Sequence, residues 1–159
     1  MTDPHRAIEA LWRIESATVI AGVARMVRDE RVKHLSVRID RTAAEAYGFL
    51  SQPENFPRWA SGMGGSLRRQ GADWLVDTPE GTATVRFSEQ NSYGVLDHQV
   101  NLPRRVPIYV PLRVVANGDA CDLVLTLFRQ PDMSDEKFAA DAEWVMRDLN
   151  AAKRLLEAG

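Results

Sequence analysis

The strongest constraint on the fold is a long amphipathic pattern at the end of the chain, over residues 134–157. Apolar side chains recur there at alternating spacings of four and three, which places them along one face of a helix. They are Phe138, Ala142, Val145, Leu149, Ala152 and Leu156. Ser134 is placed to cap this helix, and two acids follow where the helix dipole favours negative charge. A helix with such a stripe needs an apolar surface to cover it, so the remaining chain must supply one.

The residues before this helix have the pattern of a sheet with short helices. In 34–40 apolar and polar residues alternate, which predicts a half-buried strand. Thr42 and Glu45 then form a capping-box pattern that opens a short helix. From 66 to 130, strand patterns return at short intervals with turn residues between them, as in an antiparallel meander. Pro111 cannot donate to a strand ladder, so the strand over 108–114 is expected at an edge or with a bulge.

Residues 3–30 predict a separate amphipathic helix at the N-terminus. Asp3 is a plausible cap and Pro4 suits the first helical position. We expect its broad apolar face to pack on the following domain or on a second copy of the chain, which makes a homodimer one hypothesis. The predicted division is therefore a helix over 1–30 and a domain over 31–159.

Composition excludes several classes of function. The 159 residues have a formal charge of −2, which argues against general binding to nucleic acid. No apolar run approaches the roughly 20 residues of a membrane-spanning helix, and no signal peptide is evident, so we expect a cytoplasmic protein without membrane insertion. Cys121 is the only cysteine and is expected to be a small buried residue.

Several motifs, taken in order, resemble one known group of proteins. They are His34–Asp40, Thr42–Tyr47, Asn55–Ala60, Gly94–His98, Leu127–Pro131 and Met133–Glu136. With the order of elements, they make residues 32–158 resemble the START-like helix-grip superfamily, also called SRPBCC, which includes polyketide cyclase-like proteins and lipid carriers. The resemblance implies an α+β fold in which a curved antiparallel sheet of about seven strands wraps round a long C-terminal helix. It supplies no shared catalytic signature, so fold alone does not give function.

The N-terminal segment resembles a different family. Residues 5–29, and Ile8–Ala17 above all, are similar to the first helix of an extracytoplasmic-function-type sigma factor. The other helices of that family are absent from the sequence, so the resemblance implies a fused helix rather than a transcription factor.

His98 is the leading candidate for chemistry. Strand alternation places it on the same face as Leu96 and Val100, toward the expected core. There it either orients a ligand or acts as a general acid or base, or it is a buried histidine satisfied by a neighbour. Asp97 is expected to point to the opposite face, away from His98.

The other candidates are ligand-binding residues chosen for aromatic character or for their place on the C-terminal helix. They are Trp59, Trp74, Phe87, Tyr109, Val145 and Leu149. Alternation alone would turn Tyr109 to solvent unless Pro111 introduces a bulge. The histidines have no metal-ligand spacing and no cofactor motif is visible, so we expect neither metal nor cofactor.

Three hypotheses follow from these residues. The first is a protein that binds a small apolar, aromatic or lipid-like molecule between sheet and C-terminal helix. The second is a cyclase- or dehydratase-like enzyme that uses His98 as acid or base. The third is an interaction or dimerisation module acting through the N-terminal helix.

Overall fold

The computed structural model describes residues 31–61, 67–78 and 81–159. All of them except Arg31 belong to one compact unit, Val32–Gly159. The predicted N-terminal helix over 3–30 and its sigma-factor resemblance lie outside the described residues. So do the glycine-rich stretch after Ser61 and part of the turn before Gly81.

The first elements follow the predicted local patterns. β1 (Val32–Ile39) is succeeded by the helix α2 (Ala43–Leu50) and the short 3₁₀ helix η1 (Pro53–Arg58). The capping box is formed: the Glu45 amide donates to Thr42 Oγ1 at 3.3 Å, and the Thr42 amide donates to Glu45 Oε2 at 2.9 Å. These caps satisfy amides that the first turn of α2 leaves without partners.

The described strands form two antiparallel sheets. The larger one is a meander of β2 (Leu67–Gln70), β3 (Asp73–Thr78), β4 (Gly81–Phe87), β5 (His98–Asn101) and β6 (Ile108–Val110). The smaller one has the order β1-β8-β7, from β7 (Leu112–Asn117) and β8 (Ala120–Phe128). The described residues therefore hold eight strands, one more than the predicted number of about seven.

The extra strand arises at Pro111, where the predicted strand over 108–114 divides into β6 and β7. Proline has no amide hydrogen to continue a ladder. β6 pairs with β5, whereas β7 leaves that sheet and pairs with β8. Two backbone bonds of 2.9 Å join the sheets again: the Leu96 amide donates to the Leu112 carbonyl, and the Val114 amide to the Gly94 carbonyl. We call this junction the seam.

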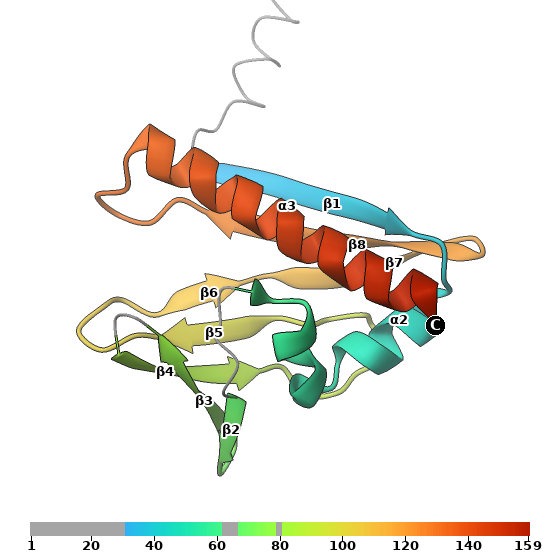
Figure 1. Cartoon of the computed structure of the whole chain (residues 1–159), viewed down its shortest axis with the longest axis horizontal. Coiled ribbons are helices and arrows are strands. Elements are labelled where there is room, and N and C mark those ends of the chain that lie inside the picture. Colours follow the sequence, from blue (N-terminus) through green and yellow to red (C-terminus); the bar gives the residue numbers. More distant parts are fainter. Residues whose placement is uncertain (1–30, 62–66, 79–80) are drawn as a thin grey trace, which may run out of the picture. The chain divides into compact units, whose positions relative to one another are not determined.

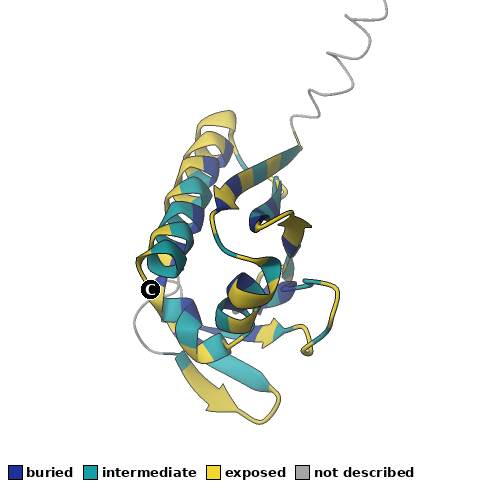
Figure 2. Cartoon of the chain, turned by 90° about the vertical axis from the view of Figure 1, so that its right-hand side faces the viewer, coloured by how far each residue is buried: buried dark blue, intermediate teal, exposed yellow. Residues whose placement is uncertain are grey.

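The C-terminal helix α3 (Asp135–Ala158) lies along the smaller sheet, beside β1, β8 and β7 (Figure 1). Ser134 caps it by accepting from the Lys137 amide at 3.2 Å, as predicted. Leu149 and Ala152 are fully buried, and in Figure 2 the face of α3 turned toward the strands is buried or half-buried while its outer face is exposed. The stripe from Val145 to Leu156 thus forms part of the main core, as a helix-grip fold requires.

We predict that a side chain at Gly94 disrupts the seam. Gly94 has φ of +71°, and an added Cβ would lie 2.2 Å from the Val114 carbonyl oxygen. Gly94→Ala should lower the free energy of unfolding by about 3 kcal/mol or more, because a backbone clash adds to the roughly 1–2 kcal/mol of a left-handed conformation. Urea unfolding followed by circular dichroism measures the loss.

Gly118→Ala is the matched control. Gly118 has φ of +63°, but a Cβ there would meet nothing within 4 Å. Only the conformational cost of about 1–2 kcal/mol applies. Equal losses for the two variants would show that the seam does not depend on the close approach at Gly94.

Candidate functional site

A cavity of about 160 Å³ lies where η1, β5, β6 and β8 face α3. Phe56 and Trp59 contribute from the η1 region, and His98 from the start of β5. Val145, Asp148 and Leu149 contribute from α3, and aliphatic side chains of the three strands complete the wall. The cavity therefore occupies the space predicted between sheet and C-terminal helix.

Four of the predicted binding residues come together at this cavity: Trp59, His98, Val145 and Leu149. Phe87 packs against the His98 ring with 5.7 Å between centroids, in a second layer of aromatic side chains.

Two predicted residues lie elsewhere. Trp74 packs in a smaller core cluster around Val76 and Val85, and Tyr109 is 52% exposed. Tyr109 is the neighbour of Val110, which is paired with His98, so Tyr109 points to the opposite face of the sheet. Pro111 ends the strand beyond this position, so it does not turn Tyr109 inward.

His98 is buried, with 6% of its surface exposed. Its Nδ1 lies 3.3 Å from the Leu96 carbonyl oxygen, and because a carbonyl only accepts, Nδ1 carries the proton. Nε2 then holds a lone pair. Burial lowers the pKa of His98 to about 4, against the weaker opposing effect of the Leu96 bond, so the ring is neutral at pH 7.

Trp59 contributes its aromatic ring to the wall. Its ring stands edge-on to Phe56 with 4.9 Å between centroids, and Phe56 in turn lies 5.3 Å from the His98 ring. The Trp59 Nε1–H is buried and has no acceptor among the described residues. An unsatisfied buried donor costs about 1–3 kcal/mol, so this group is unusual in a packed core.

Asp148 brings a carboxylate to the same cavity. Its Oδ1 accepts from the Ser61 amide at 3.1 Å and from the Ser61 hydroxyl at 2.6 Å. Trp144 donates to the same hydroxyl at 2.8 Å. These bonds attach the chain after η1 to α3. Sequence reasoning missed Asp148, although it lies three residues after Val145 and so borders the apolar stripe.

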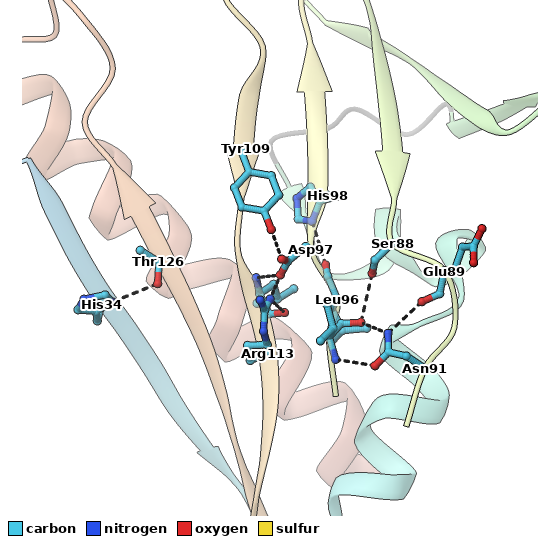
Figure 3. A network of polar contacts seen from close by, with 12 residues as sticks. His34, Ser88, Glu89, Asn91, Leu96, Asp97, His98, Tyr109, Arg113 and Thr126 are labelled. Carbon is cyan, nitrogen blue, oxygen red and sulfur yellow. Dashed lines mark hydrogen bonds and ion pairs between the residues drawn. The ribbon is translucent and has the colours of Figure 1, made fainter. Parts of the chain in front are cut away.

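Asp97 lies on the opposite side of the strand from His98, as alternation predicts (Figure 3). It is nevertheless buried, and it accepts from Tyr109 Oη, pairs with Arg113, and accepts from the Leu112 amide at 3.0 Å. The Leu112 amide belongs to the seam, so this carboxylate fastens the two sheets from outside. Asp97 and His98 therefore do not form a catalytic dyad.

Neither a metal site nor a membrane-spanning helix is found in the part of the chain that the structure describes. Its histidines, cysteine and acids form no cluster able to hold a metal ion. None of its helices is both long and apolar enough to cross a membrane.

Comparison with solved structures shows the fold. A START superfamily protein from Mycobacterium smegmatis matches with a TM-score of 0.61 and 12% identity, covering 80% of this chain and 98% of the other. The Zhui aromatase/cyclase from Streptomyces sp. R1128 matches with a TM-score of 0.61 and 18% identity, covering 80% and 93%. The protein XoxI from Bacillus cereus matches with a TM-score of 0.65 and 15% identity, covering 80% and 96%.

The chain thus has the START-like helix-grip fold, and the neighbours include aromatase/cyclases. Neither a protein-family profile nor a curated protein matches the sequence. The comparisons therefore give no support to the sigma-factor resemblance of residues 5–29.

We predict that burial of His98 makes stability depend on pH. The folded state holds the pKa near 4, against 6.5 for the free side chain. As pH falls below 6.5 the unfolded state takes up the proton first, so the free energy of unfolding decreases until pH 4. The full loss is about 3 kcal/mol.

Urea unfolding of wild type and His98→Leu at pH 7.5, 5.5 and 4.5 measures this effect. The carboxylates titrate in both proteins, so the difference between them isolates His98. The free energy of unfolding of wild type, measured relative to His98→Leu, should fall by about 2–3 kcal/mol from pH 7.5 to 4.5. Parallel pH profiles would contradict a buried neutral ring.

Proposed function

We propose that this protein binds a small, mostly apolar molecule in the cavity between the sheet and α3. The observation that carries the proposal is a cavity of about 160 Å³ with mainly apolar walls and the buried His98 at its side. Ligand sites are typically concave and apolar, with a few polar groups that fix orientation. The START and aromatase/cyclase neighbours are consistent with a ligand-holding fold.

The size of the cavity limits the ligand. Sites for drug-sized molecules usually measure roughly 300–1,000 Å³, whereas an apolar cavity of about 150 Å³ accommodates benzene. At about 160 Å³ this cavity suits one aromatic ring or a short aliphatic chain. A ligand with several fused rings would extend beyond this volume.

A cyclase- or dehydratase-like enzyme is the second candidate, because His98 borders the cavity and an aromatase/cyclase shares the fold. General acid–base catalysis works best with a pKa near the operating pH, and a pKa of about 4 makes His98 a weak base. Binding is therefore the better-supported function. Dehydration of a small β-hydroxy ketone, followed by enone absorbance, tests the enzyme: turnover that His98→Ala abolishes without unfolding would favour catalysis.

Filling the cavity should remove binding. Val145 lines the cavity from α3, so Val145→Phe places a ring inside it. A panel of single-ring and short-chain apolar compounds should raise the melting temperature of wild type by several degrees at saturating ligand and leave Val145→Phe unshifted. Differential scanning fluorimetry measures both.

Met146→Phe is the control, because Met146 lies in a groove between α3 and β1 outside the cavity. This variant should keep the wild-type shifts. A wild type that no member of the panel stabilises, or a Val145→Phe variant that responds like wild type, would count against binding at this site.

A further inference from the structure

The smaller sheet has an open edge at β1. In the order β1-β8-β7, β1 pairs only with β8, and Figure 1 shows it at the margin of that sheet beside α3. His34 lies opposite Thr126, whose amide donates to the Pro111 carbonyl at 3.0 Å, on the β7 side. This pair is therefore not hydrogen-bonded, and the main-chain groups of His34 point away from β8. Ser36, two residues later on the strand, has the same orientation.

The helix α3 covers only one end of this open edge. Lys153 Nζ donates to the Arg38 carbonyl at 2.6 Å, and the Asp40 amide donates to Glu157 Oε1 at 2.8 Å. The outward main-chain groups earlier in β1 have no such partner among the described residues. A row of unpaired amides and carbonyls at a sheet edge can pair with the strand of another chain.

A groove lies beside the open edge, between β1 and α3. Its volume is about 920 Å³, and its apolar side chains are Leu35, Ala139, Ala142 and Met146. Every described residue that lines it belongs to β1 or α3 and none to β8, so the groove follows the edge of the sheet. A strand added to β1 would direct alternate side chains to this side.

The charges of this groove favour an acidic occupant. Lys33 lines it from β1, and Arg147 and Arg154 line it from α3, whereas Glu143 is the only carboxylate among the described lining residues. Within the part of the chain that the structure describes, none of these three cations forms an ion pair. Three cations against one carboxylate would attract acidic side chains and repel basic ones.

The same charges disfavour a second copy of this chain as the occupant. In a two-fold dimer the same surface patch of both copies meets itself. Pairing of β1 with its own copy would therefore gather the groove cations of both chains at one junction, and like charges placed together are destabilising.

From these observations we propose that β1 and the groove beside it dock an extended acidic segment of a partner protein, which adds to the smaller sheet as a strand. Its main chain bonds to the outward groups of His34 and Ser36, and its acidic side chains lie near Lys33, Arg147 and Arg154. The site lies outside the cavity, so this inference does not depend on the proposed function.

Synthetic peptides test the proposal on the full chain by fluorescence anisotropy at pH 7.5 and low ionic strength. The probe is a labelled peptide of about nine residues in which glutamate and valine alternate. One control has lysine in place of glutamate, which reverses the charge. The other is the glutamate peptide N-methylated at every residue, which keeps the charge and removes the amide donors.

The probe should bind at least about tenfold more tightly than either control, because only the probe offers both acidic groups and strand donors. An advantage below about threefold over either control would overturn the inference, as would no binding by any of the three peptides.

Variants of the protein then assign the binding to this edge. Ser36→Pro removes an outward amide, and proline is tolerated on an edge strand where the amide has no partner in the sheet. It should weaken binding of the probe about tenfold or more while the melting temperature changes little. The double variant Arg147→Glu with Arg154→Glu should remove the preference for the glutamate peptide over the lysine peptide.

Two controls complete the experiment. Arg69→Glu reverses an exposed charge on β2, in the other sheet, and Val145→Phe fills the cavity; both should bind the probe like wild type. Equal losses in Arg69→Glu and in the arginine double variant would show a general charge effect and overturn the site, and loss in Val145→Phe would place the peptide in the cavity instead. If Ser36→Pro does not fold, the three peptides and the arginine variants still decide the proposal.

Discussion

The position of the cavity depends on the seam between the two sheets. Pro111 ends the ladder of β6, and the chain then pairs with β8 in the other sheet. Gly94 permits the close approach that joins the sheets again, and buried Asp97 holds the Leu112 amide from outside. Because of this exchange, side chains from β5, β6 and β8 meet on one wall opposite α3. The cavity follows from how the sheets join.

The parts of this fold that depend on local patterns were predictable from the sequence. The stripe of α3, its Ser134 cap and the Thr42 capping box are properties of a few neighbouring residues. The sequence predicted a disturbed strand at Pro111, because proline lacks an amide hydrogen. It did not predict that the chain would then pair with β8, because the choice of partner strand depends on distant residues. The place of Asp148 at the cavity was not predictable, because a cavity depends on the volumes of side chains from five elements.

Trp74 and Tyr109 show a related limit. Both were chosen for aromatic character, yet Trp74 fills the smaller core cluster and Tyr109 binds Asp97 on the far face. The alternation of side chains along the strand had already placed Tyr109 on the solvent side. This local pattern predicted its position better than its aromatic character did. Residue type indicates what a side chain can contact, whereas strand register decides which side it contacts.

Two polar groups in this interior oppose stability. A core selected for packing alone would hold apolar side chains at these two positions. Instead, Trp59 has an N–H without an acceptor among the described residues, and His98 has an imidazole kept neutral by burial. The same burial separates binding from catalysis. A histidine with a pKa near 4 is neutral at pH 7. It can then accept a hydrogen bond, but it is too weak a base to remove the proton of the donor.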